Sequence, residues 1–161
     1  MIISPGHLDD PRVIALLRLH LESMHVHSPP GTVHALDLSA LKRPEVTFFT
    51  AWDGGELLGC GALRELSAGQ GEIKSMRTAP AHVRKGVAAA LVRHILEEAR
   101  RRGYRRVSLE TGSGDAFEGA ITLYGKFGFV RGEAFGGYVA TDFNQFFHLD
   151  LPTTDAQPTL G

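Results

Sequence analysis

Residues 72–91 combine the residue types and spacing that are most typical of a ligand site. An expected strand ends before Pro80, a basic loop with Arg84 and Lys85 follows, and Gly86 begins a long helix. The first turn of a helix has backbone N–H groups without partners, and its dipole carries about half a positive charge. This order therefore predicts an anion site, suited to a phosphate group.

Small residues at Gly86, Ala88 and Ala89 would let a phosphate approach the backbone closely. The alternative is an ordinary basic start of a helix without a ligand. Other phosphate motifs fit less well, because the chain has no Gly-x-x-x-x-Gly-Lys-Ser/Thr and no Gly-x-Gly-x-x-Gly after a strand. Residues 112–114, Gly-Ser-Gly, are not the Gly-x-Ser-x-Gly of a nucleophile elbow.

Four histidines lie close together near the start of the chain, at His20, His25, His27 and His34. Neutral imidazoles are common metal ligands, but no cysteines stand at matching spacing and no His-Glu-x-x-His occurs. We therefore expect no metal site. The single Cys60 has no internal disulfide partner and is expected to be a small buried residue.

Length and composition indicate an ordinary globular protein. The chain has 161 residues, 43% of them hydrophobic and 22% charged, and a formal net charge of −1, which argues against a nucleic-acid partner. With no long apolar run and no signal peptide, we expect a cytoplasmic protein without a membrane partner. Residues 1–151 are expected to form a single domain and residues 152–161 a disordered tail.

The apolar pattern alternates between helical and strand-like periods. We expect helices over residues 10–24 and 35–42, then strands over 46–52, 57–66 and 72–78. A helix from residue 86, a strand over 105–110, a helix around 117–124 and strands at 129–131 and 145–151 follow. Asp53-Gly54-Gly55 predicts a hairpin turn between the first two strands. The order predicts an α/β protein with a mixed sheet.

Residues 80–91 resemble the pyrophosphate-binding motif A of the GNAT N-acetyltransferases, whose core is Gln/Arg-x-x-Gly-x-Gly/Ala. The six core positions are Val83, Arg84, Lys85, Gly86, Val87 and Ala88. Val83 departs from the pattern, since the family usually has Arg or Gln there. Because backbone amides make most of the phosphate contacts in that family, this departure is expected to weaken CoA binding rather than abolish it.

A second match, Ala-Ile-Thr-Leu-Tyr-Gly-Lys-Phe-Gly-Phe at residues 120–129, resembles the family's motif B, Ala-x-x-Leu-Tyr-x-x-x-Gly-Phe. The resemblance covers about residues 46–149. The sequences Ser-Pro-x-x-x-Val-His-Ala-Leu-Asp and Glu-Ile-Lys-Ser-Met-Arg are similar to the small bacterial YsnE-type branch. The resemblance implies a GNAT-type α/β (α+β) fold: a mixed, mostly antiparallel sheet flanked by helices, with a splayed strand pair forming the CoA cleft.

The resemblance also implies a function. The expected reaction transfers an acetyl group from acetyl-CoA to a primary amine of a small-molecule or amino acid-like acceptor, by direct attack in a ternary complex. No metal is expected, and a homodimer is compatible because dimers are frequent in the family. An acetyl-CoA-binding sensor or structural module without catalysis is the alternative, and a nucleotide-binding protein lacks the required lysine spacing.

Individual residues take roles from the same resemblance. Glu72 stands where many family members carry a catalytic glutamate and would act as general base, directly or through a water; the alternative is a surface strand residue. Tyr124 stands at the general-acid position and would protonate the CoA thiolate, although it could also pack against the sheet. The residues expected to contact acetyl-CoA are Met76, Arg77, Thr78, Val83, Arg84, Lys85, Gly86, Val87, Ala88, Ala89 and Ala120.

The acceptor is expected to meet the early histidines and an aromatic loop. The residues expected to contact it are His25, His27, His34 and Tyr138. Phe135 and Phe143 would form the opposite wall together with Tyr138. The cations Arg64, Lys74 and Arg77 could face an anionic group of the acceptor, although charged strand residues are usually only solvated.

Overall fold

The computed structural model describes residues 1–31 and 37–152. In this part of the chain, seven strands form one sheet in the order β1-β2-β3-β4-β5-β7-β6. All neighbouring strands are antiparallel except β4 and β5, which are parallel. The strands are β1 (Ile2–Pro5), β2 (Val46–Asp53), β3 (Glu56–Ser67), β4 (Gln70–Thr78), β5 (Arg106–Thr111), β6 (Val130–Gly132) and β7 (Gln145–Asp150). The helices are α1 (Pro11–His27), α2 (Leu38–Leu41), α3 (Val87–Arg101) and α4 (Asp115–Lys126), with a 3₁₀ turn at Pro80–His82.

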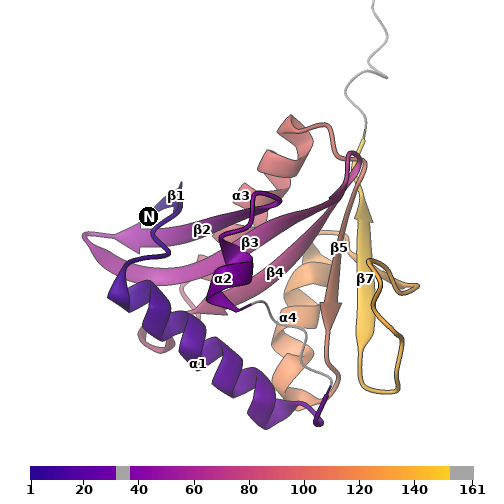
Figure 1. Ribbon diagram of the computed structural model, residues 1–161, viewed down its shortest axis with the longest axis horizontal. Coiled ribbons are helices and arrows are strands. Elements are labelled where there is room, and N and C mark those ends of the chain that lie inside the picture. Colours follow the sequence, from indigo (N-terminus) through magenta and orange to yellow (C-terminus); the bar gives the residue numbers. More distant parts are fainter. Residues whose placement is uncertain (32–36, 153–161) are drawn as a thin grey trace, which may run out of the picture.

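Helices cover both faces of the sheet (Figure 1). α1 and α2 pack on one face, and α3 and α4 pack on the other. Because side chains alternate along a strand, neighbours such as Phe48 and Phe49 enter different cores. β3 is buried without interruption from Leu57 to Leu63, which explains why its sequence is an apolar run rather than an alternating one.

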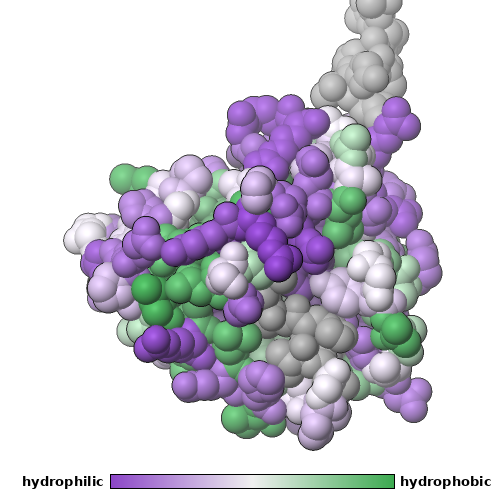
Figure 2. Space-filling view, viewed as in Figure 1, coloured by the Kyte–Doolittle hydropathy of each residue, from purple (hydrophilic) through white to green (hydrophobic). Residues whose placement is uncertain are grey.

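The face that carries α1 and α2 is shown in Figure 2. Hydrophobic side chains gather between these two helices, in the left half of the view. Beneath this face lies a core of buried side chains contributed by α1, α2, β2 and β3. Its members are Val13, Leu16, Leu17, Leu41, Phe48, Leu57, Cys60 and Ala62. This core holds α1 against the sheet beside the opening described below.

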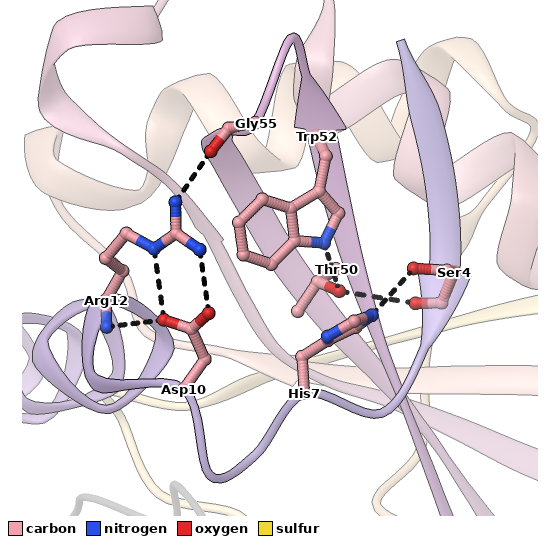
Figure 3. A network of polar contacts seen from close by, with 7 residues as sticks. All are labelled: Ser4, His7, Asp10, Arg12, Thr50, Trp52 and Gly55. Atoms are coloured by element: carbon pink, nitrogen blue, oxygen red, sulfur yellow. Dashed lines mark hydrogen bonds and ion pairs between the residues drawn. The ribbon is translucent and has the colours of Figure 1, made fainter.

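The N-terminus of α1 is fastened to the β2–β3 hairpin (Figure 3). Asp10 caps the helix by accepting from the Arg12 backbone N–H at 2.8 Å, and Arg12 Nη1 donates to the Gly55 carbonyl at 2.6 Å. The Arg12 guanidinium also lies 4.7 Å from the centre of the Trp52 ring. An N-cap and a cation–π contact are each weak at an exposed position, so several small contributions together fix this end of the helix.

The structure confirms most of the expected elements. The hairpin turn forms as expected, with Gly54 and Gly55 at φ 56° and 86°, which a two-residue type I′ turn requires. α1 ends three residues later than the expected residue 24, at His27. Strand β1 was missed, because four residues are too few to display a period. Across the described residues, none of the helices combines the length and apolar character that crossing a membrane requires.

Candidate active site

The site begins where strands β4 and β5 separate. Their parallel register ends at Glu72 and Ser108. Within the described sheet, no strand pairs with the β5 side of β4 beyond this point. Those backbone N–H and C=O groups of residues 73–78 that point away from β3 are therefore accessible to a ligand from that side. This separation agrees with the splayed strand pair that the resemblance implied.

A β-bulge lies in β4 at the opening. Ala62 of β3 pairs with Lys74, but Cys60, two residues earlier, pairs with Arg77, three residues later. The extra residue is accommodated by Ser75, which has a positive φ of 56°. The Cys60 thiol donates to the Ser75 carbonyl at 3.4 Å, and burial raises the pKa of Cys60 to about 12, so this cysteine is a buried thiol as expected.

The bulge changes which side chains share a face of the sheet. Glu72 and Arg77 are five residues apart, an odd number that would place them on opposite faces of a regular strand. With one extra residue between them, Glu72, Lys74 and Arg77 all lie on one face. It is the α1 face, because their partners Cys60 and Ala62 belong to the core beneath α1.

A cavity of about 460 Å³ lies between the separated strands, within the usual range for small-molecule sites. α1 and α4 contribute its other walls. Polar lining residues are His20, Ser23, His27, Glu72, Lys74, Ser75, Arg77, Glu110, Thr111 and Asn144. The remaining lining residues are Met24, Ile73, Met76, Leu109, Gly112, Ala116, Phe117, Ala120, Tyr124 and Phe143.

Glu72 has a buried carboxylate on the wall of this cavity, with 1% of its side chain exposed. Its Oε2 accepts from the Tyr138 hydroxyl at 2.7 Å. Its Oε1 is 3.8 Å from Arg64 Nη1 and has no hydrogen-bond partner in the part of the chain that the structure describes. A buried polar atom without a partner is uncommon in native proteins and indicates a position for a water or a ligand.

Tyr138 connects Glu72 to Lys74. The Tyr138 hydroxyl accepts from Lys74 Nζ at 2.7 Å while it donates to Glu72, and Lys74 Nζ is 3.6 Å from Glu72 Oε2. Burial raises the pKa of Glu72 above its usual value and lowers the pKa of Lys74, while their mutual attraction opposes both shifts. A carboxyl with a raised pKa in a cavity is suited to accept a proton near neutral pH.

A second carboxylate, Glu110 of β5, also lines the cavity. Asn144, just before β7, donates to Glu110 Oε2 at 2.9 Å. The negative charge of Glu110 acts on both Glu72 and Lys74, so the three groups form one electrostatic cluster. Neither Glu110 nor Asn144 was predicted from the sequence. The available signal was a carboxylate at the end of the strand expected beside the one that carries Glu72.

Tyr124 of α4 lies on the same cavity as Glu72. Its ring packs edge-on against Phe129 with centroids 5.6 Å apart, and its hydroxyl makes no hydrogen bond to any described residue. Burial raises the pKa of Tyr124, so the phenol keeps its proton at neutral pH. The side chain therefore packs in the core and also presents a hydrogen-bond donor to the cavity.

The start of α3 forms a second part of the site, outside the cavity lining. Gly86 precedes the helix with a φ of 81°, and across the described residues neither a side-chain cap nor an acidic side chain occupies its first turn. Arg84 also has a positive φ of 63°. A Cβ on Gly86 would meet no atom within 4 Å, so backbone conformation, rather than crowding, favours glycine here. The loop leaves first-turn N–H groups available for an anion.

The structure brings some predicted site residues together and leaves others apart. Met76, Arg77, Ala120 and His27 line the cavity with the two predicted catalytic residues. Thr78 ends β4 just beyond this lining, and residues 83–89 form the separate α3 start. Tyr138 contacts the Glu72 carboxylate.

Other predicted acceptor residues lie elsewhere. His25 is exposed on α1 and is not part of the cavity lining, and His34 lies outside the described residues. Phe143 lines the cavity. Phe135 is not part of the lining and packs against Tyr138 and Phe146. Among residues 1–31 and 37–152, no three His, Cys, Asp or Glu side chains are grouped to hold a metal ion. The expected absence of a metal remains a prediction.

Comparison with known proteins gives the chain its family. The model of the acetyltransferase (GNAT) family matches residues 13–129. The chain is 53% identical over 138 residues to the uncharacterized N-acetyltransferase YsnE of Bacillus subtilis, covering 86% of this chain and 91% of that protein. It is 42% identical over 156 residues to the uncharacterized N-acetyltransferase YedL of Escherichia coli, covering 97% and 98%.

A solved structure shares the fold. A Klebsiella pneumoniae protein described as an acyl-CoA N-acyltransferase superposes with a TM-score of 0.78 at 28% identity, covering 93% of this chain and 97% of that one. The family match spans more than half of the chain, and the relatives align over most of their length. The protein therefore belongs to the GNAT family of N-acetyltransferases, as the motifs around Gly86 and Tyr124 predicted.

Proposed function

We propose that the protein transfers the acetyl group of acetyl-CoA to a primary amine of a small-molecule or amino acid-like acceptor, by direct attack in a ternary complex. The observation that carries the proposal is the Glu72 carboxylate, buried on the cavity between β4 and β5, with one oxygen that accepts no hydrogen bond from any described residue. Alkyl amines have pKa values near 10, so a base is needed to make the attacking nitrogen neutral at pH 7.

Two features of the chain fit acetyl-CoA. The open edge of β4 offers the backbone groups of Met76, Arg77 and Thr78 to an amide-containing arm, in the manner of an added strand. The α3 start, residues 83–89, offers backbone N–H groups and basic side chains to a diphosphate. Ala120 on α4 is small, and it lines the cavity opposite β4 without filling it.

The backbone N–H near Met76 would stabilise the oxyanion of the tetrahedral intermediate. Loss of one such donor typically costs about 2.7–4 kcal/mol of transition-state stabilisation. The bulge supports this role, because it interrupts the regular pairing of β4 with β3 between Lys74 and Arg77. The geometry of this segment is set by the fold before any ligand binds, as electrostatic preorganisation requires.

Glu72 and Tyr124 would act on the two protons of the reaction. The amine nitrogen forms a bond to the acetyl carbon, Glu72 accepts the proton that the nitrogen loses, directly or through a water, and the carbon–sulfur bond breaks. Tyr124 donates a proton to the departing thiolate, for which its buried, protonated phenol is suited. A sensor that only binds acetyl-CoA would not need both groups on one cavity.

Binding and turnover test the two halves of this proposal. Calorimetry with acetyl-CoA, CoA and ATP should show binding of the first two only, and thiol release with a panel of amines should then show transfer. Binding of acetyl-CoA without transfer to any amine would favour the sensor. Preferential binding of ATP would contradict both readings.

Gly86→Asp tests the α3 start, because it places a side chain and a negative charge where the diphosphate must approach. Gly103→Asp is the matched control: Gly103 also has a φ of about 80°, and a Cβ there would also meet no atom within 4 Å, but it lies at the other end of α3. Both variants take on the backbone strain of a positive φ, and the helix dipole makes Gly103→Asp the less stable of the two. Only Gly86→Asp should weaken acetyl-CoA binding, by at least about tenfold given the charge repulsion. Wild-type affinity in Gly86→Asp would refute the assignment.

A further inference from the structure

Arg77 differs from the other charged groups on the cavity. Glu72, Lys74 and Glu110 are grouped together, as described above. Arg77 is half-buried and has no ion pair with any described residue; its Nε donates instead to Nδ1 of His20 on α1, at 3.0 Å. A guanidinium has five N–H donors, so its Nη groups are left to bind a further partner.

His20 is suited to hold Arg77 in place. It is 8% exposed, and burial together with the charges of Arg77 and Lys74 lowers the pKa of His20 to about 4. The imidazole is therefore neutral at pH 7, and its Nδ1 can accept the hydrogen bond from Arg77. A fixed guanidinium loses less conformational entropy when it binds a planar anion in bidentate geometry.

The bulge places Arg77 and Glu72 within reach of the same small molecule. Their partners on β3, Cys60 and Arg64, are four residues apart, so the two Cα atoms are separated by roughly 13 Å at 3.3 Å per residue. Both side chains lie on the α1 face and line one cavity. A molecule that offers an amine to Glu72 can therefore offer a second group to Arg77.

We propose that this second group is a carboxylate, so that the acceptor is of the amino-acid class: Arg77 binds the carboxylate through its Nη groups, and His20 positions the guanidinium. This inference rests on the proposed function, since it is the acceptor amine that faces Glu72. The charges fit a zwitterion, with an ammonium group beside the carboxylates of Glu72 and Glu110 and a carboxylate beside Arg77.

The test compares amino acids with their primary amides, which have the same amine and side chain but no negative charge. For each pair, the ratio of kcat/KM for the acid to kcat/KM for the amide is measured by thiol release in wild type and Arg77→Met. An amino acid and its amide differ in the pKa of the amine, but this difference affects the ratio equally in wild type and in Arg77→Met. It therefore cancels when the two ratios are compared. A hydrogen bond to a charged group changes a binding constant by about 10- to 100-fold. Arg77→Met should therefore lower the acid-to-amide ratio by that factor.

Three further variants separate charge recognition from structural damage. Arg93→Met removes an arginine of α3 that lies outside the cavity, over the ring of Phe127. This variant should leave the ratio unchanged. His20→Leu removes the acceptor for Arg77 Nε and should lower the ratio. His20→Asn, whose amide oxygen can replace Nδ1, should restore most of it, which a merely structural role for His20 would not explain.

The outcomes distinguish this inference from the proposed function. If amines are acetylated but Arg77→Met keeps the wild-type ratio, the carboxylate site is refuted and the acetyltransferase proposal stands. If neither acids nor amides nor other amines release thiol although acetyl-CoA binds, the amine-transfer proposal fails and this inference fails with it. A lowered ratio in Arg77→Met and His20→Leu, with recovery in His20→Asn, supports it.

Discussion

Replacing Glu72 with glutamine removes the candidate base while it keeps the shape of the side chain. Glu72 Oε2 already accepts from Tyr138, so Oε1 is the oxygen left to take a proton. In the variant, the amide oxygen can keep the hydrogen bond from Tyr138 and the amide nitrogen takes the place of Oε1. A donor then stands where the reaction needs an acceptor.

The expected loss in kcat/KM is about 10²–10⁴-fold, the usual contribution of a general acid or base. At 1.36 kcal/mol for each factor of ten, this is about 3–5 kcal/mol of transition-state stabilisation. Folding stability must be measured beside the rate. The variant gives up the ion pairs of Glu72 with Lys74 at 3.6 Å and with Arg64 at 3.8 Å, and removing one partner of a buried pair costs about 3–5 kcal/mol. Because Lys74 keeps the attraction of Glu110, the loss is expected to fall below this range.

The pH dependence identifies a base more sharply than the rate does. Burial raises the pKa of Glu72, so in wild type kcat/KM should rise with pH until this carboxyl is ionised and then become nearly flat. The Gln variant depends on the small neutral fraction of free amine, which grows tenfold per pH unit up to the amine pKa near 10. The deficit of the variant should therefore shrink as the pH increases. Thiol release between pH 6.5 and 9.5 measures it.

Glu110→Gln is the matched control, because it removes the same charge from the same cavity on the neighbouring strand. Because Glu110 was placed beside the acceptor ammonium group and its charge raises the pKa of Glu72, this variant should bind the acceptor more weakly and ionise Glu72 at a lower pH. Once Glu72 is ionised, its deficit should not depend on pH. Full activity of Glu72→Gln across the pH range would refute the assignment of Glu72. A pH-dependent deficit in Glu110→Gln alone would transfer the role of base to Glu110.

Two further predictions concern Tyr124 and His20. Tyr124→Phe keeps the ring that packs on Phe129 and loses the donor, so kcat should fall while acetyl-CoA affinity by calorimetry is kept; an unchanged kcat would contradict the role as acid. The pKa of His20 is about 4 in the folded protein and 6.5 in the unfolded chain, so its contribution to stability is present above pH 6.5 and is lost as the pH falls toward 4, by up to roughly 3 kcal/mol. Urea unfolding at pH 7.5 and pH 5 should show a smaller acid-induced loss in His20→Asn, and equal losses would contradict this.

The strong periodic patterns of the sequence predicted the helices and most strands. The apolar stripe of α3, the Asp53-Gly54-Gly55 turn and the two family motifs were enough to predict the fold and the cavity-facing position of Tyr124. Those signals are local, and each depends on residues within about fifteen positions of one another. β1 had no such signal, because it is stabilised by pairing with β2 rather than by its own four residues.

The electrostatics of the site could not be predicted in this way. Glu72 contacts Tyr138, and Arg77 contacts His20, across 66 and 57 residues of sequence. The contact of Arg77 also depends on the bulge, and no residue pattern in β4 predicts that Ser75 adopts a positive φ. From the sequence, Arg77 was therefore one of three candidate cations, and only the fold separates it from Lys74 and Arg64.

The contacts that fasten the start of α1 affect how the acceptor enters the cavity and how the product leaves it. Asp10, Arg12 and Trp52 hold the first turn, whereas His20 and His27 on the later turns form part of the cavity wall. Among the described residues, the contacts that fasten α1 lie at its start, and a helix fastened mainly at one end opens at lower cost toward the other. Acceptor entry and product escape are thus expected through transient fraying of the last turns of α1, while the buried first half keeps the sheet covered. Amide hydrogen exchange would register this gradient as slow exchange near Leu16 and faster exchange near His27.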